Sequence, residues 1–107
     1  MIYWKQQTMD KSKILSILGL CQRANRLVSG EEMSLDKIKS NQAKLVILAN
    51  DAGYNTTKRV TDKSKTYQVQ VINVFSSDEI SKAIGKSNRK VLAIKDQGFA
   101  KKIISLL

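Results

Sequence analysis

The sequence predicts an α/β protein, a three-layer α/β/α sandwich around a mixed sheet of roughly four strands. Segments with apolar residues at helical spacing alternate with short β-rich apolar runs along nearly the whole chain. One run, residues 44–49, is apolar after its first residue, as expected of a central strand covered on both faces. The 107 residues are predicted to form one domain with a modest core, with residues 1–9 as a loose leader in which Trp4 docks on a nearby apolar surface.

The first half of the chain begins with a helix predicted over residues 10–24. Its apolar stripe consists of Ile14, Leu15, Ile17, Leu18 and Cys21. A short strand at residues 27–28 leads into a second helix over residues 30–39, whose buried side is predicted to hold Met33, Leu35 and Ile38. Ser29 is expected to cap this second helix through its hydroxyl, and Glu32 has the spacing that completes a capping box.

The second half repeats the alternation. A polar, basic helix capped by Asn55 is predicted over residues 55–65, and residues 67–75 return to β-rich sequence. Ser76 and Glu79 have capping-box spacing and begin the next helix, whose apolar side is predicted to hold Ile80, Ala83 and Ile84.

A basic loop over residues 85–90 precedes a strand predicted over residues 91–94. The last helix, over residues 99–106, is expected to close the domain with Ile103, Ile104 and Leu107.

The charge balance of the chain indicates the class of partner. The chain holds 19 Lys and Arg residues against 9 Asp and Glu, a formal net charge of +10. So large an excess on a small domain predicts a polyanionic partner, either nucleic acid or an acidic membrane surface, and we favour nucleic acid. No apolar run is long enough to cross a membrane, and we expect neither a signal peptide nor a membrane partner.

The composition also argues against catalysis. The chain has no histidine, which removes the commonest general base, and one cysteine with few carboxylates makes a poor zinc site. We therefore expect a non-catalytic protein without metal or cofactor. Cys21 is interpreted as a small core residue, and a lone cysteine suits a reducing compartment, so a cytoplasmic location is predicted.

The helix start near Gly30 is predicted to be the working end of the protein. Such a start presents unpaired amide donors and the positive end of the helix dipole, and a glycine lets another molecule come close. We expect positive potential to converge on the same rim. Arg23 and Arg26, just before it, are given two equal interpretations: a phosphate clamp beside the helix tip, or a solvated helix end.

The order of elements and several short motifs resemble the L-seven-Ae family of RNA-binding ribosomal proteins, most of all its short bacterial branch. The residues that carry the resemblance are Val28-Ser29-Gly30 at a helix start, the run from Ala43 to Asp51, and Ile84-Gly85 before the last strand. The match covers nearly all of the chain from about Met9. It implies a three-layer sandwich that binds kink-turn RNA, a sharply bent internal loop with tandem sheared G·A pairs.

Carried over by position, the resemblance implies three groups of RNA-binding residues. These are Gly30, Glu31 and Glu32; Asn50 and Asp51; and Lys86, Ser87, Asn88 and Arg89, to which we add Arg26, Ser29 and Lys37 as candidates. The best-known binders have Asn-Glu one residue after the glycine and a later Lys. This chain has Glu32-Met33 and Asp36 at those positions, with its lysine displaced to Lys37.

Two interpretations of the glutamates remain open. Glu31 and Glu32 accept hydrogen bonds from base amino groups, or they only cap the helix and complement its dipole, which we favour for Glu32. The function expected is non-catalytic binding of structured RNA, a kink-turn-like element or an rRNA internal loop, by a monomeric, ribosome-associated protein. The alternative is a protein-interaction module whose acidic Glu31-Glu32 tip meets a basic partner.

Overall fold

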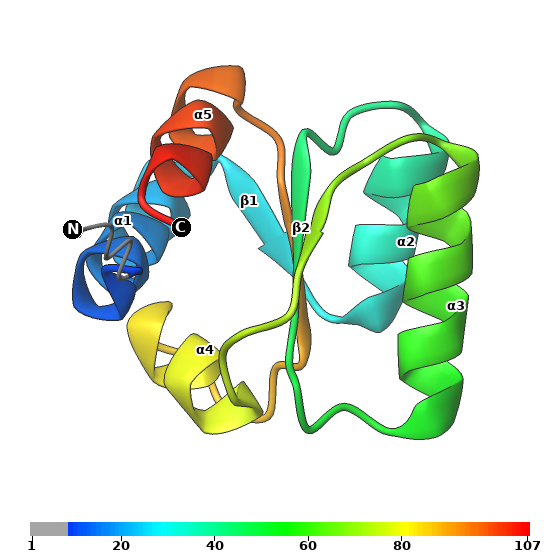
Figure 1. Ribbon diagram of the computed structural model, residues 1–107, viewed down its shortest axis with the longest axis horizontal. Helices are drawn as coiled ribbons and strands as arrows, with labels where there is room; N and C mark the ends of the chain where they lie inside the picture. The colour runs from blue at the N-terminus through cyan, green and yellow to red at the C-terminus, as the bar shows by residue number, and fades with distance from the viewer. Residues whose placement is uncertain (1–8) are drawn as a thin grey trace, which may run out of the picture.

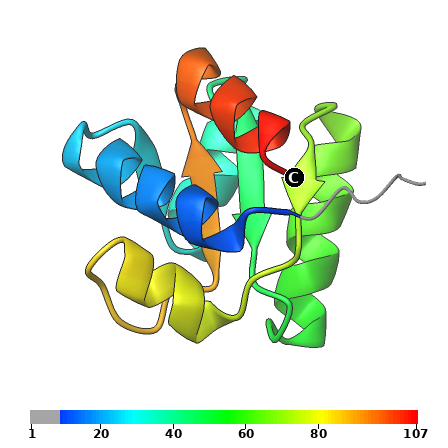
Figure 2. The same cartoon turned by 60° about the vertical axis from the view of Figure 1, so that its left-hand side comes forward.

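The computed structural model describes residues 9–107 and folds this part of the chain into five helices and one four-stranded sheet (Figure 1). The elements in chain order are α1 (Lys11–Arg23), β1 (Leu27–Ser29), α2 (Glu31–Lys39), β2 (Leu45–Leu48), α3 (Tyr54–Thr66), β3 (Val71–Ile72), α4 (Ser77–Ala83), β4 (Val91–Ile94) and α5 (Gln97–Ser105). The helices α1, α4 and α5 cover one face of the sheet, and α2 and α3 cover the other (Figures 1 and 2). The predicted three-layer α/β/α sandwich is confirmed.

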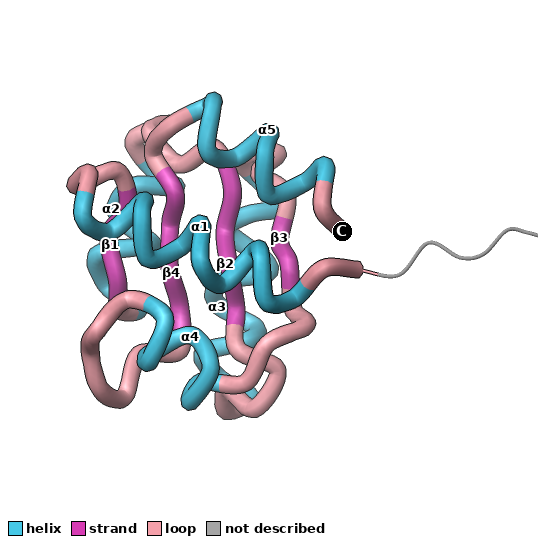
Figure 3. The backbone as a smooth tube through the Cα atoms, turned by 90° about the vertical axis from the view of Figure 1, so that its left-hand side faces the viewer, coloured by secondary structure: helices cyan, strands magenta, loops and turns pink. Residues whose placement is uncertain are grey.

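The sheet is mixed, with strand order β1-β4-β2-β3 (Figure 3). Strand β4 is antiparallel to β1 and β2, whereas β3 is parallel to β2. The two central strands β2 and β4 are buried along their whole length, which explains why both are continuous apolar runs. Consequently β1 and β2 end at the edge of the sheet where β4 begins.

The core forms on both sides of the sheet, because successive strand residues point to opposite faces. Ile47 and Leu92 pack with the helices α1, α4 and α5 in one cluster that includes Phe75. Val46 and Ala93, their neighbours in sequence, pack in a second cluster with α2 and α3.

The start of α2 differs from the sequence prediction. The helix begins at Glu31 with Gly30 as N-cap, and no side chain caps it. Ser29 is the last residue of β1, because the chain turns one residue later, at Gly30, with φ 102° and ψ 154°. The predicted Ser29 cap and its capping box with Glu32 are therefore wrong. Met33 was expected inside but is 56% exposed.

Helix α3 also begins elsewhere than predicted. Gly53 is its N-cap, without a side-chain cap, so Asn55 lies within the first turn and does not cap it. The β-rich sequence over residues 67–75 forms only the two-residue strand β3.

At the last helix, Asp96 caps α5 by accepting a hydrogen bond from the Phe99 amide (2.8 Å), so α5 starts at Gln97. Ile103 is buried, but Ile104 and Leu107 are each 38% exposed and do not close the core as expected.

The predicted capping box at α4 is confirmed. The Ser76 hydroxyl accepts from the Glu79 amide (3.1 Å), and the Glu79 carboxylate accepts from the Ser76 amide (2.9 Å). Glu79 also forms an ion pair with Lys11 of α1. These contacts fix α4 beside α1.

At the N-terminal side, Met9 packs against the core and Asp10 donates its amide to the Leu106 carbonyl (3.1 Å). Most of the predicted leader, including Trp4, lies outside the described residues. Within residues 9–107, no helix has the length and apolar character needed to cross a membrane.

Candidate nucleic-acid interface

One edge of the sheet gathers three segments that are far apart in sequence: the start of α2, the β2–α3 loop and the α4–β4 loop (Figure 3). Backbone hydrogen bonds hold them together, since the Gly30 amide donates to the Val91 carbonyl and the Ala49 amide donates to the Lys90 carbonyl, each at 2.8 Å. The Asn50 amide donates to the Phe75 carbonyl (2.8 Å), which also joins the segment before α4 to this edge. We call this edge the rim. It consists of Ser29, Gly30, Glu31, Glu32, Asn50, Asp51, Lys86, Ser87, Asn88, Arg89 and Lys90.

All predicted site residues except Arg26 and Lys37 lie at the rim. Arg26 precedes β1, whereas Gly30 follows it, and the Arg26 carbonyl accepts from the Lys95 amide (2.8 Å) at the other edge of the sheet. A clamp of Arg26 beside the helix tip is therefore wrong. Lys37 lies in the last turn of α2, roughly 10 Å along the helix axis from Gly30.

The start of α2 is open at Gly30. A Cβ atom built there would meet no atom within 4 Å, so the space beside the backbone is free. Because no side chain caps α2, the amides of its first turn remain available as donors at the positive end of the helix dipole. The rim therefore offers main-chain donors to an approaching acceptor.

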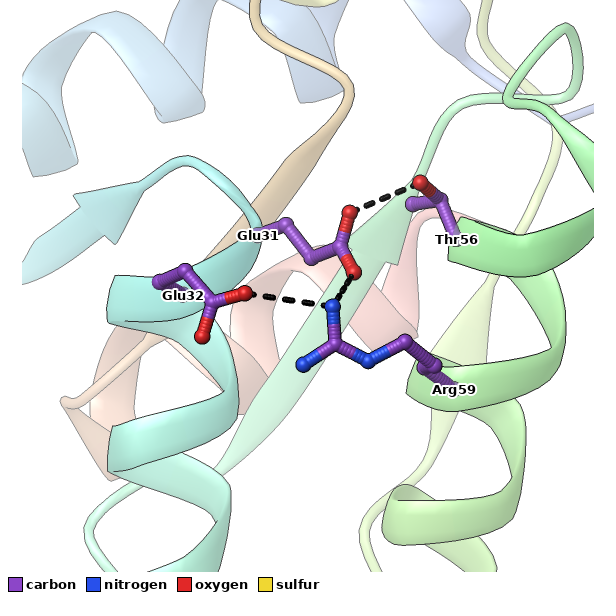
Figure 4. Close-up of polar contacts among 4 residues, drawn as sticks. All are labelled: Glu31, Glu32, Thr56 and Arg59. Atoms are coloured by element: carbon purple, nitrogen blue, oxygen red, sulfur yellow. Dashed lines mark hydrogen bonds and ion pairs between the residues drawn. The ribbon is translucent and has the colours of Figure 1, made fainter.

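The two glutamates at this tip are bound by α3 (Figure 4). Glu31 accepts a hydrogen bond from the Thr56 hydroxyl (2.7 Å) and forms an ion pair with Arg59. Arg59 also contacts the Glu32 carboxylate at 3.1 Å. Glu32, and then Glu31, raise the pKa of the Arg59 guanidinium above its ordinary value. Thus α3 holds both carboxylates in place and offsets their charge.

Sequence reasoning missed Thr56 and Arg59 because it assigned α3 a solvated, basic face. Their three-residue spacing places them on neighbouring positions of one helix face. Only the parallel packing of α3 beside α2 turns that face toward the two glutamates.

Asp51 links the β2–α3 loop to α4. Its carboxylate accepts from both the amide and the hydroxyl of Ser77, each at 2.8 Å. The Ser77 hydroxyl, followed by the Ser77 amide, lowers the pKa of Asp51 below its ordinary value. Asp51 therefore serves to position this loop, while its neighbour Asn50 is exposed at the rim.

Arg89 gives the α4–β4 loop a fixed shape. Its side chain donates to the Ser29 hydroxyl (3.1 Å) and to the Ser87 carbonyl (3.0 Å). Its amide donates to the hydroxyl of the buried Ser81 (2.8 Å). The loop turns at Asn88, which has a positive φ of 55°. Lys86, Ser87 and Asn88 are exposed, so a rigid loop presents them.

A polar hollow of about 260 Å³ lies between the helix tip and this loop. It is lined by Gly30, Glu31, Thr56, Asn88, Lys90 and Val91. Four of these residues bear a carboxylate, a hydroxyl, a side-chain amide and an ammonium group, which are the kinds of donor and acceptor that pair with an unpaired base. Lys90 was absent from the predicted site, although it directly follows Arg89.

The positive charge does not converge on the rim as expected. Three carboxylates and four cations lie there or in direct contact with it: Glu31, Glu32, Asp51, Arg59, Lys86, Arg89 and Lys90. The local charge is thus nearly balanced, and most of the +10 lies elsewhere.

Comparison with known proteins places this chain in one family. The model of the ribosomal protein L7Ae/L30e/S12e/Gadd45 family matches residues 12–104. The RNA-binding protein YlxQ of Enterococcus faecium is 45% identical over 98 residues, covering 92% of this chain and 94% of that protein. The protein of the same name in Bacillus subtilis (strain 168) is 48% identical over 91 residues, covering 85% and 91%.

Two solved structures are similar to this chain. A protein of unknown function from Bacillus halodurans C has a TM-score of 0.84 and 42% sequence identity, covering 88% of this chain and 95% of that one. The Giardia lamblia 15.5kD RNA binding protein has a TM-score of 0.76 at 17% identity, covering 94% and 92%, which is a likeness of fold alone. The chain belongs to the ribosomal protein L7Ae/L30e/S12e/Gadd45 family.

Proposed function

We propose that this chain is a non-catalytic protein that binds structured RNA through the rim. The observation that carries the proposal is the uncapped, open start of α2 at Gly30, held beside the rigid loop that presents Lys86 and Asn88. The relatives named as RNA-binding proteins support RNA as the partner. A helix tip of this kind donates amides to phosphate or base acceptors, and the loop contributes cations for the backbone.

The RNA is a kink-turn-like element or an rRNA internal loop, and the protein is a cytoplasmic monomer associated with ribosomes. A regular A-form helix hides its bases in a narrow groove, whereas an irregular loop exposes them. In this proposal Glu31, which Thr56 and Arg59 hold and which lines the hollow, accepts hydrogen bonds from base amino groups.

The helix face beside Gly30 bears on the specificity. Met33 stands where the best-known kink-turn binders have glutamate, and its side chain is 56% exposed. Asp36, where those binders have lysine, is also exposed. We infer that this face offers an apolar contact and a carboxylate in place of their polar pair, so the preferred loop differs in its bases.

The alternative, a protein-interaction module with an acidic tip, is less well supported. Arg59 offsets the charge of both Glu31 and Glu32, so the tip does not present the acidic surface that this alternative needs. It remains as an outcome of the experiment.

The experiment captures partners of the full chain from lysate, with and without nuclease. Recovery of ribosomal particles that is lost after nuclease supports RNA binding, and nuclease-resistant capture of one protein overturns it in favour of the alternative. Purified protein is then titrated with an RNA hairpin that carries a tandem G·A internal loop. The control is the same hairpin with the loop closed by Watson–Crick pairs, measured at 200 mM salt to suppress non-specific binding. Preference for the internal loop is expected, and equal binding contradicts recognition at the rim.

Two double variants test whether the RNA binds at the rim. The double variant Lys86→Gln/Lys90→Gln removes two rim cations, and Lys13→Gln/Lys101→Gln removes two exposed cations on α1 and α5. The rim variant should lose most of the preference for the internal loop, while the matched control keeps it.

A further inference from the structure

A second basic surface lies at the edge of the sheet opposite the rim, at the top of Figure 1, where α2 and α3 end and β2 and β3 begin. We call it the distal edge, and its cations are Arg26, Lys37, Lys39, Lys44, Lys63, Lys65 and Lys95.

Three of these cations form a row along the ends of adjacent strands. The Lys95 amide donates to the Arg26 carbonyl (2.8 Å), which joins the end of β4 to the start of β1. The Lys44 amide donates to the Ile94 carbonyl (2.7 Å), which joins the start of β2 to the same strand end. Because neighbouring strands are about 4.8 Å apart, Arg26, Lys95 and Lys44 follow one another across three strands.

The ends of the two helices extend this row. The Lys37 carbonyl accepts from the Gln42 and Ala43 amides (2.9 and 3.1 Å), which folds the end of α2 back against Lys44. The Gln70 carbonyl accepts from the Val46 amide (3.0 Å), which brings the segment after α3 beside β2. Lys37 and Lys39 on α2, and Lys63 and Lys65 on α3, therefore flank the strand ends.

The cations of the distal edge outnumber its carboxylates, of which Asp96 follows Lys95 at the end of β4. The ion pairs found within residues 9–107 involve Lys11, Lys58, Arg59 and Lys82, and none of these cations belongs to the distal edge. Attraction to the helix dipoles accounts for lysines in the last turns of α2 and α3. Arg26 lies just beyond the end of α1, where its amide donates to the Cys21 carbonyl (2.9 Å), so that dipole also favours it. Lys95, at the end of β4, is not in the last turn of a helix.

The distal edge also carries amides, and its α2 and α3 side has no large exposed apolar side chain among the described residues. Asn25, Asn41 and Gln68 all have positive φ and follow the ends of α1, α2 and α3 at this edge. Of the large exposed apolar side chains of the described residues, Leu20 in the last turn of α1 lies near this edge, beside Asp96 and Phe99 on the side of the sheet that α1 and α5 cover, away from α2 and α3. The others lie in the first turns of α2 and α3, or on α5 and just beyond it. Cations with neutral amides suit phosphates and 2′-hydroxyls. A protein partner or a membrane would need apolar anchors as well.

We propose that the distal edge binds the phosphate backbone of a regular RNA duplex, while the rim holds an irregular loop. The two surfaces face opposite ways along the strands, so one molecule bridges two RNA segments. This inference rests on the proposed function only in that RNA is the partner, because the residues of the two surfaces are separate.

The test compares two triple variants of the full chain with equal loss of charge. Lys39→Gln/Lys44→Gln/Lys65→Gln changes exposed lysines of the distal edge, and Lys13→Gln/Lys101→Gln/Lys102→Gln changes exposed lysines of α1 and α5. Affinity for a fully paired 20-bp RNA is measured at several salt concentrations. Each lost phosphate contact makes the negative slope of log K against log salt shallower by roughly 0.7 to 0.9. The magnitude of this slope should therefore fall by about 2 to 3 for the distal variant and by less than about 1 for the control.

A bridging assay completes the test. Protein captured on an immobilised internal-loop hairpin should recruit a labelled plain duplex, and the distal variant should remain captured but lose that recruitment. Equal slopes for the two variants, or unchanged recruitment, would overturn the inference while leaving the rim proposal intact. Loss of anionic-vesicle binding or of acidic-peptide binding by the distal variant, with duplex affinity unchanged, would also overturn it. Failure of the wild-type protein to bind the hairpin at all would instead contradict the proposed function.

Discussion

Arg89 donates a hydrogen bond from its Nε to the Ser29 hydroxyl at 3.1 Å, although 60 residues of sequence separate the two. The contact joins the α4–β4 loop to the end of β1, two residues before the start of α2. It explains why Ser29 does not cap the helix, since its hydroxyl faces the loop instead. The two parts of the rim are thus held in a fixed relation before any RNA arrives, which reduces the ordering that binding requires.

Comparing Ser29→Ala with Arg89→Ala separates positioning from charge. Both substitutions remove the hydrogen bond, so both should weaken binding to the internal-loop hairpin. Only Arg89→Ala removes a cation. If Arg89 contacts one phosphate, this substitution should reduce the magnitude of the slope of log K against log salt by roughly 0.7 to 0.9. Fluorescence anisotropy at four salt concentrations measures both effects. Wild-type affinity for Ser29→Ala would contradict the positioning role, and an unchanged slope for Arg89→Ala would contradict the phosphate contact.

Gly30→Ala should destabilise the fold without any steric clash. The backbone at Gly30 has φ 102° and ψ 154°, a region open almost only to glycine, yet a Cβ there would meet nothing within 4 Å. The expected loss is about 1 to 3 kcal/mol in the free energy of unfolding. Gly53→Ala is the matched control, because Gly53 is also an N-cap in open space but has φ −64°. It should be neutral or stabilising by about 0.4 to 1 kcal/mol. Urea unfolding that shows equal effects for both variants would refute the conformational argument.

Arg59→Gln should weaken RNA binding although Arg59 is placed behind the glutamates. Without the guanidinium, the Glu31 and Glu32 carboxylates remain uncompensated where phosphates approach. A several-fold loss of affinity for the internal-loop hairpin is expected, with little change in the melting temperature since the Arg59 side chain is 52% exposed. Lys58→Gln, the neighbouring residue paired with Asp62, removes the same charge away from the rim and should change affinity less. The additional change Glu32→Gln should restore affinity. Equal losses of affinity for Lys58→Gln and Arg59→Gln would show that the net charge of the protein, and not the contact of Arg59 with the glutamates, determines the effect.

Asp51→Ala should be less stable than the wild-type protein at neutral pH, and this difference in unfolding free energy should shrink as the pH falls. Ser77 lowers the pKa of Asp51 in the folded state, so the unfolded chain takes up the proton first. The stabilisation is therefore complete above the unfolded pKa of about 4, and it is lost as the pH falls through the lowered folded value. Unfolding free energies at pH 7, 5, 3 and 2 should show the largest gap at pH 7 and convergence below pH 4. The gap for Asp36→Ala, an exposed carboxylate, should be small throughout. A gap for Asp51→Ala that persists at pH 2 would show that the carboxylate charge is not its source.

The fold was largely predictable because each signal was local. The run at residues 44–49 and the alternation of helices and strands report burial directly, and the Ser76–Glu79 box depends only on neighbours in sequence. The helix starts at Gly30 and Gly53 were missed for a physical reason. Polar residues such as Ser29 and Asn55 are good caps in isolation, but tertiary partners decide where the chain turns, and here Ser29 is bound to Arg89.

The candidate site was predictable in its segments but not in its contacts. The order of motifs placed Gly30, Asp51 and Arg89 at one edge, and the sheet does bring them there. The partners of the glutamates came from α3, whose orientation depends on helix packing that no local pattern encodes. The position of Arg26 was wrong because a strand of only three residues was enough to carry it to the opposite edge.

Cys21 of α1 is fully buried in the core cluster on the side of the sheet that α1, α4 and α5 cover. Burial, followed by the negative charge of Asp96, raises the pKa of this thiol to about 11. The thiolate is the reactive form, so an aromatic disulfide reagent at pH 8 should label the native protein only through transient opening, far more slowly than the chain in 6 M urea. Gly30→Ala should speed the native labelling tenfold for each 1.4 kcal/mol that it removes from the free energy of opening, whereas Gly53→Ala should not. Native labelling at the rate of the unfolded chain would show that Cys21 is accessible, which the packing of α1 against the sheet does not allow.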